Sequence, residues 1–122
     1  MPDPDLLTIK LRLLHRGCFA MGPGKAALLE AIEETRSVAA AGRKLGLSYW
    51  KTRRLLEEIN QCFLAPLVAA TKGGQKGGGS RLTPAGLEAV ARFRAMEAAA
   101  RAAAAPMAEA YRELLAPGGP IA

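Results

Sequence analysis

Residues 37–61 read SVAAAGRKLGLSYWKTRRLLEEINQ. Two serines in this stretch are suited to begin helices, because a serine side chain can accept a hydrogen bond from a free backbone amide of the first helical turn. Ser37 would cap a short helix, Gly46 would end it in a left-handed turn, and Ser48 would cap a second helix running to about residue 61. The pattern predicts a helix-turn-helix, although such helical hairpins also occur in proteins that bind no DNA.

The second predicted helix has an apolar side and a polar side. At about 100° of rotation per residue, the apolar side gathers Thr52, Leu55, Leu56, Ile59 and Cys62. The polar side gathers Trp50, Arg53, Arg54, Glu57 and Gln61. A tryptophan between arginines on a polar face is unusual, so Trp50 either packs against a neighbouring element or belongs to a binding surface.

Positive charge is concentrated around this predicted helix pair. The chain of 122 residues has a formal net charge of +6. Residues 1–42 and 82–122 are each balanced, whereas residues 43–81 hold eight basic side chains against Glu57 and Glu58. A localised positive field is expected of a protein that binds a polyanion, but a basic surface without a partner would have the same charge.

A glycine-rich basic segment follows the helix pair. Residues 67–71 and 80–83 read as short strands, and the sequence between them is KGGQKGGG. The bare glycine backbone would let this hairpin approach phosphates closely, with Lys72, Lys76 and Arg81 as the contacts. The other interpretation is a flexible glycine linker between domains.

The segments before residue 37 predict a strand, a turn and a helix. Apolar and polar side chains alternate over residues 7–13, which predicts a strand with one buried face. Residues 15–24 hold three glycines and a proline and read as a turn. Helical spacing of leucine and isoleucine predicts a helix over residues 24–35.

A long helix is predicted after the hairpin. Thr83 can cap it and Pro84 can occupy its first turn, while Pro106 should end or kink it. The alanine-rich run over residues 98–105 has a high helix propensity and a smooth surface. We expect this run to pack against a second copy of the chain; the alternative is a solvated, alanine-rich tail.

The length and composition fit one domain, residues 1–122, with a mainly α fold and a small β component. We expect a core over about 7–97, a helical extension over about 98–115 and a tail over 116–122. Nothing in the sequence is long and apolar enough to cross a membrane, and the acidic start is unlike a secretory signal, so a cytoplasmic location is expected. Cys18 and Cys62 are too few for a disulfide scaffold.

Motifs that carry catalysis or metal binding are missing from the sequence. His15 has no cysteine or histidine at ligand spacing, and Lys76 is followed by glycine rather than by the serine or threonine of a phosphate-binding loop. The acidic residues fall on the outer faces of predicted helices and not in a cleft. We therefore expect no enzyme activity, no cofactor, no metal site and no small-molecule effector.

Several short motifs occur in a recognisable order. They are Gly22-Pro23-Gly24-Lys25, Leu28-Leu29-Glu30-Ala31-Ile32, Leu45-Gly46-Leu47-Ser48-Tyr49, Glu58-Ile59-Asn60, and Gly77-Gly78-Gly79 before Leu82-Thr83 and Gly86. Over about residues 7–97 the chain resembles the N-terminal DNA-binding domain of the ModE family of bacterial molybdate-responsive transcriptional regulators. The resemblance implies a winged helix-turn-helix, related in shape to the LysR-type domain, in which the glycine-rich hairpin is the wing.

The chain departs from that family in several places. The C-terminal molybdate-binding domains have no counterpart within these 122 residues, so the resemblance implies DNA binding but gives no support for molybdate binding. Arg36 stands where glycine is usual, and Trp50 where a basic residue is more common. Gly42 replaces the usual alanine, which on helix propensity alone should loosen the short helix by about 1 kcal/mol.

These observations predict a dimeric regulator that binds double-stranded DNA at a near-palindromic operator, with half-sites about 34 Å apart. The expected DNA contacts are Ser48, Tyr49, Trp50, Lys51, Arg53, Arg54, Lys72, Lys76 and Arg81. Among these, Arg53 is expected to read a base, because arginine pairs with guanine through two hydrogen bonds. The first strand and the long helix are expected to form the dimer contact.

Two other functions remain open at this stage. A winged helix can serve as a protein–protein interaction module without binding DNA, with Trp50 and the long helix as the binding surface. A weaker possibility is a sensor of small oxyanions, with molybdate held by backbone amides of the glycine loop.

Overall fold

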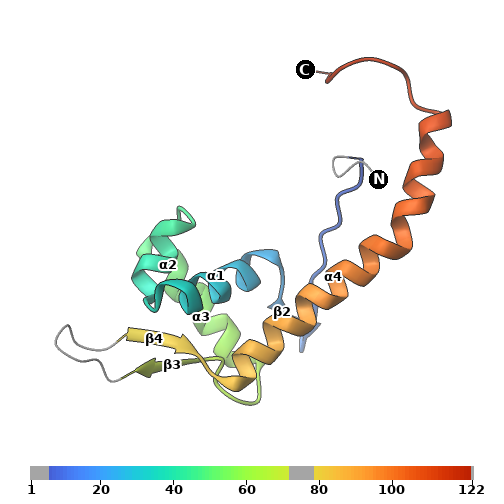
Figure 1. Cartoon of the computed structure of the whole chain (residues 1–122). Helices are drawn as coiled ribbons and strands as arrows, with labels where there is room; N and C mark the ends of the chain where they lie inside the picture. Colours follow the sequence, from blue (N-terminus) through green and yellow to red (C-terminus); the bar gives the residue numbers. More distant parts are fainter. Residues whose placement is uncertain (1–5, 72–78, 122) are drawn as a thin grey trace.

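The computed structural model describes residues 6–71 and 79–121. It is mainly helical with two small antiparallel sheets, so the predicted fold class is confirmed at that level (Figure 1). The elements in chain order are β1 (Leu13–His15), β2 (Cys18–Met21), α1 (Pro23–Thr35), α2 (Val38–Lys44), α3 (Tyr49–Cys62), β3 (Val68–Thr71), β4 (Gly79–Leu82), α4 (Pro84–Ala110) and the short 3-10 helix η1 (Tyr111–Glu113).

Local hydrogen bonds begin α2 and α3 where the serines predicted. The Ser37 hydroxyl oxygen accepts a hydrogen bond from the backbone amide of Ala40 at 3.0 Å, and that of Ser48 accepts one from Lys51 at 3.1 Å. Between the helices, Gly46 has a φ of +71°, the left-handed conformation that glycine adopts without steric cost. Both helix starts and the glycine turn are therefore confirmed.

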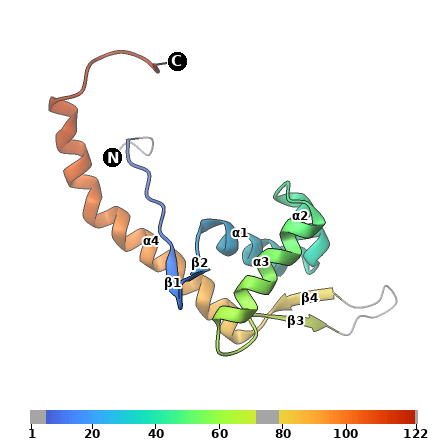
Figure 2. The ribbon, with the colours of Figure 1, turned by 180° about the vertical axis from the view of Figure 1, so that it is seen from behind.

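The predicted strand over residues 7–13 is wrong in extent, because the strand begins only at Leu13. The turn lies at Arg16 and Gly17, whose φ values of 52° and 82° belong to the two-residue turn that matches strand twist. The second strand, β2, occupies part of the segment that was predicted as a turn. Residues 6–12 instead run beside α4, where Arg101 donates a hydrogen bond to the Leu7 carbonyl at 2.9 Å (Figures 1 and 2).

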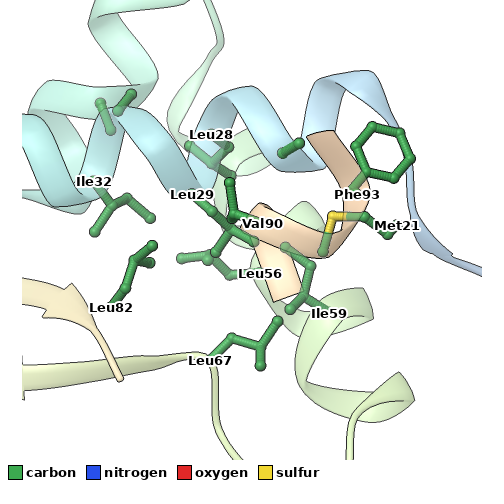
Figure 3. Close-up of a cluster of buried hydrophobic side chains, with 13 residues drawn as sticks. Met21, Leu28, Leu29, Ile32, Leu56, Ile59, Leu67, Leu82, Val90 and Phe93 are labelled. Atoms are coloured by element: carbon green, nitrogen blue, oxygen red, sulfur yellow. The ribbon is translucent and has the colours of Figure 1, made fainter. Parts of the chain in front are cut away.

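The hydrophobic core lies between α1, α3, α4 and the β3–β4 hairpin, as Figure 3 shows. Its largest fully buried side chains are Met21, Leu28, Leu29, Ile32, Ile59 and Leu67. Phe93 from α4 closes one end of the cluster and Leu82 from β4 lies toward the other. Burying one such aliphatic side chain stabilises the fold by about 1.5–3 kcal/mol, so this cluster holds α1, α3, α4 and the β3–β4 hairpin together.

Two glycines allow backbone segments to approach closely. A Cβ at Gly42 would lie 2.4 Å from the Thr52 hydroxyl oxygen, so an alanine does not fit where α2 crosses α3. This contact opposes the helix propensity that favours alanine at position 42, and the expectation from sequence counted the propensity alone. A Cβ at Gly86 would lie 2.1 Å from the Leu67 carbonyl oxygen, so α4 needs glycine in its first turn.

The β3–β4 hairpin is fastened to the C-terminal end of α1. The backbone amide of Ser80 donates to the carbonyl of Arg36 at 2.9 Å, and that of Leu82 donates to the Glu33 carboxylate at 3.0 Å. The Arg81 guanidinium lies 3.6 Å from the same carboxylate. These contacts set the direction in which the hairpin leaves the core.

The long helix α4 projects away from the rest of the chain (Figure 2). It continues through Pro106 to Ala110, so Pro106 does not end it, although the helix axis bends in its last turns (Figure 1). Near the core, Arg94 binds Glu30 of α1 at 2.6 Å and Glu97 at 2.7 Å, and these hydrogen bonds raise the pKa of the guanidinium above its ordinary value. Over the part of the chain that the structure describes, no helix is long and apolar enough to cross a membrane.

Candidate nucleic-acid interface

The exposed side of α3 brings six of the predicted DNA-binding residues together. They line an open groove of about 690 Å³ with Glu57, and they are Ser48, Tyr49, Trp50, Lys51, Arg53 and Arg54. Their common position follows from the cap at Ser48 and from burial of the opposite side through Thr52, Leu56 and Ile59. The predicted division of this helix into a buried and an exposed side is confirmed.

Trp50 is the most exposed aromatic residue of this groove. Its relative exposure is 81%, and its ring meets the Tyr49 ring edge to face with 5.4 Å between centroids. Of the two interpretations of Trp50, the structure excludes burial against a neighbouring element. An exposed indole beside a phenol offers a flat apolar surface and two polar groups to a partner.

Charge along the groove is mostly positive. Glu58, one turn beyond Arg54, lies 3.9 Å from that guanidinium and 3.3 Å from the Lys25 ammonium. Lys25 is only 6% exposed and also donates a hydrogen bond to the Phe19 carbonyl. Glu58 is therefore shared between Arg54 and Lys25, and the groove itself is lined by Lys51, Arg53 and Arg54 against Glu57.

The Ser48 side chain has two roles available to it. Its oxygen already accepts the hydrogen bond that caps α3. A hydroxyl keeps its own hydrogen when it accepts, so the same group can still donate to an anion in front of the helix. The predicted contact at Ser48 is therefore compatible with its function as a cap.

The sequence prediction missed Arg43. This residue of α2 and Arg53 of α3 line one hollow of about 370 Å³ between the two helices. Its position in the basic part of the sequence was the available signal, but periodicity alone did not show that Arg43 and Arg53 line the same hollow. Its neighbour Lys44 points elsewhere and pairs with Glu34 at 2.6 Å.

Of the three predicted hairpin contacts, only Arg81 lies within the described residues. Lys72 and Lys76 lie outside the described residues. Arg81 is on β4, where its guanidinium is paired with Glu33 of α1. Arg81 therefore helps to anchor the hairpin to α1, a role that the sequence did not predict.

No family model matches the chain. Similar curated proteins exist, however, and the resemblance covers most of this sequence. The chain is 43% identical over 86 residues to the molybdenum-pterin-binding protein MopB of Rhodobacter capsulatus, an alignment that covers 70% of this chain and 32% of that protein. It is 37% identical over 95 residues to the molybdenum transport protein ModE of Herbaspirillum seropedicae, with 78% and 34% covered.

A second ModE gives a longer alignment. The molybdenum transport protein ModE of Azotobacter vinelandii is 34% identical over 102 residues, covering 84% of this chain and 37% of that protein. The chain thus spans about a third of the length of the curated relatives that it matches. Over most of its own length, it is similar to proteins named for molybdenum-pterin binding and molybdenum transport.

Proposed function

We propose that this chain is a winged helix-turn-helix protein that regulates transcription by binding double-stranded DNA as a homodimer in the cytoplasm, and that it is not an enzyme. In this assignment α2 and α3 are the helix-turn-helix and the β3–β4 hairpin is the wing. The ModE-named relatives support a regulator related to molybdenum, because the family that the sequence resembles regulates transcription in response to molybdate.

The observation that carries this proposal is the groove along α3. Lys51, Arg53 and Arg54 lie there with an exposed tryptophan, and α3 begins at a capped end that points its first residues outward. Recognition helices enter the major groove in this way, with their N-terminal residues toward the base edges. Arg43 would contact phosphates from the neighbouring helix, since the first helix of such a pair crosses the DNA backbone.

A second copy of the chain would complete the DNA-binding unit. The segment before β1 and the projecting end of α4 form an apolar hollow of about 430 Å³, lined by Leu6, Leu7, Ala104, Met107, Ala108, Tyr111 and Leu115. Met107 is 70% exposed and Tyr111 60% exposed in the single chain. We call the exposed apolar residues of α4 in this hollow the apolar stripe. Burial of the apolar stripe against the same residues of a second chain would pair two α3 helices, as a near-palindromic operator requires.

The proposal is tested by DNA binding at several salt concentrations. Duplexes are first enriched from random sequence with the purified chain, and binding is then followed by fluorescence anisotropy. If each subunit neutralises about four phosphates, the logarithm of the affinity falls with the logarithm of salt concentration with a slope of about −7. A flat salt response, or no enrichment of any duplex, would overturn DNA binding.

A protein–protein interaction module is the second candidate, and the 81% exposure of Trp50 is the observation that favours it. Under that function, replacing Lys72 and Lys76 by glutamate would leave binding to the partner unchanged, whereas DNA binding would weaken strongly. Absence of molybdate binding in calorimetry would in turn exclude the oxyanion sensor.

A further inference from the structure

A second basic hollow flanks α3 on the side of Lys51. Its volume is about 570 Å³, and its walls come from the segment before β1, from β2, from the start of α1, from the α2–α3 turn and from one side of α3. Lys10, Arg12 and Lys51 line it together with Phe19 and Leu47. We refer to this feature, defined by these five residues, as the arm hollow.

Cations dominate the arm hollow. Lys10 and Arg12 are exposed, and the Arg12 guanidinium carbon lies 4.9 Å above the centre of the Phe19 ring. Stacking uses the face of a guanidinium and leaves the N–H donors at its edge available. The acidic residue that lines the hollow is Glu58, which Lys25 already binds at 3.3 Å.

The hollow between α2 and α3, which Arg43 and Arg53 line, is the α2–α3 hollow. The arm hollow and the α2–α3 hollow lie on opposite flanks of α3. Lys51 and Arg53 are two residues apart, which is about 200° of rotation around a helix. Arg53 lines the α2–α3 hollow with Arg43, and Lys51 lines the arm hollow with Lys10 and Arg12. Basic side chains therefore follow both sides of the same helix.

DNA in a major-groove complex presents phosphates to both of these sides. An α-helix with its side chains is about 10–12 Å across. It therefore fills a major groove about 12 Å wide and has one DNA strand along each flank. A cationic surface on each flank matches that arrangement, because phosphates on both strands fix the register of the helix.

We propose that Lys10 and Arg12 bind phosphates of the DNA strand opposite to the one that Arg43 contacts. This assignment rests on the proposed DNA-binding function and adds two residues that the basic middle part of the sequence does not include. Contacts of this kind position the protein without reading sequence, so they strengthen binding to operator and unrelated DNA alike.

The test uses the full chain with Lys10→Gln, Arg12→Gln and the double substitution. In a dimer, the double variant loses four phosphate contacts, so the salt slope becomes shallower by about 3–4, while Lys10→Gln alone changes it by about 2. The ratio of operator to unrelated DNA affinity stays the same. Arg92→Gln is the matched control, because Arg92 lies on α4 and pairs with Glu88 at 2.8 Å, far from α3 in sequence.

Phosphate-ethylation interference identifies the strand. Ethylation of certain phosphates should block DNA binding by the wild-type chain. On one strand, these ethylations should no longer weaken binding by the double Lys10→Gln, Arg12→Gln variant. On the other strand, they should no longer weaken binding by Arg43→Gln. Circular dichroism checks that each variant is folded. If Arg12→Gln disturbs the stacking on Phe19, the proposal is tested with Lys10→Gln alone.

The outcomes separate the two proposals. If the wild-type chain shows no salt-dependent DNA binding, the proposed function fails and this assignment fails with it. If the wild type binds with a steep slope but Lys10→Gln and the double variant behave like Arg92→Gln, DNA binding stands and the second phosphate contact is overturned. An unchanged ethylation pattern in the double variant would also overturn it.

Discussion

The carboxylate of Glu33 in α1 accepts a hydrogen bond from the backbone amide of Leu82 in β4 at 3.0 Å, across 49 positions of sequence. Leu82 is only 4% exposed, so water does not satisfy its amide in the folded chain. The same carboxylate lies 3.6 Å from the Arg81 guanidinium. One side chain thus fixes the base of the hairpin that we propose as the wing.

Replacing Glu33 with alanine should lower the free energy of unfolding by about 1–3 kcal/mol, because a buried backbone donor is left without an acceptor. Glu33→Gln keeps an amide oxygen for that donor and should recover most of the loss. Urea denaturation followed by circular dichroism measures both. The control is Glu34→Ala, whose exposed ion pair with Lys44 should contribute less than about 1 kcal/mol. Equal losses for the Glu33 and Glu34 variants would contradict this role of Glu33.

Gly42→Ala should destabilise the chain by about 1–3 kcal/mol, since the added methyl group overpacks the α2–α3 crossing. Helix propensity alone predicts the opposite sign, a gain of about 1 kcal/mol. Thermal unfolding distinguishes the two. Gly24→Ala is the matched control, because a Cβ there meets nothing within 4 Å. Replacing Thr52 with alanine as well should relieve part of the Gly42→Ala loss, and failure of that rescue would refute the contact as its cause.

Arg36→Gly should stabilise the chain by about 0.5–1 kcal/mol. Arg36 caps the C-terminal end of α1 with a φ of 62°, and its backbone groups bond to Ile32 and Ser80 at 2.7 Å and 2.9 Å. A left-handed conformation costs an L-residue with a Cβ about 1–2 kcal/mol, and glycine avoids this cost but loses more chain entropy on folding. Gly46→Ala places a Cβ at φ +71° and should shift the unfolding midpoint in the opposite direction.

Arg53→Ala should weaken binding to the enriched DNA by about 1–3 kcal/mol and relax the preference at one base pair. Lys76→Gln is the contrasting variant, because a phosphate contact should weaken all sequences by the same factor. Competition binding against a set of single-base variants of the operator measures both effects. A uniform loss for Arg53→Ala would assign that arginine to phosphate contact rather than base reading.

Met107→Glu should shift the chain from dimer to monomer, because two buried carboxylates would face the apolar stripe on α4. Sedimentation at several protein concentrations gives the association state, and DNA affinity should fall with it as the second half-site is lost. Arg92→Gln should remain dimeric. A monomeric wild-type chain, or a dimer that tolerates Met107→Glu, would contradict the α4 contact.

Much of the local structure was predictable because it depends on neighbouring residues. The serine caps at Ser37 and Ser48, the turn at Gly46 and the start of α4 at Thr83 each involve groups within four positions of one another. The exposed side of α3 followed from helical periodicity in the same way. Such features need no knowledge of what the rest of the chain does.

The less predictable features are contacts between residues distant in sequence. Arg101 of α4 donates a hydrogen bond to the Leu7 carbonyl, 94 positions earlier in the sequence. Buried Lys25 donates one to Glu58, 33 positions later. Alternating residues 7–12 therefore do not form a strand, and a lysine in a glycine motif becomes part of the interior.

Caps, turns and helix faces were encoded locally, because the groups that form them are neighbours along the chain. Three features arise only when the helices pack: the close approach at Gly42, the common hollow of Arg43 and Arg53, and the placement of Lys10 and Arg12 beside α3. A periodic sequence pattern does not specify which distant residues come close in space, because packing of the helices decides that. The proposed binding surface combines residues that only packing places side by side.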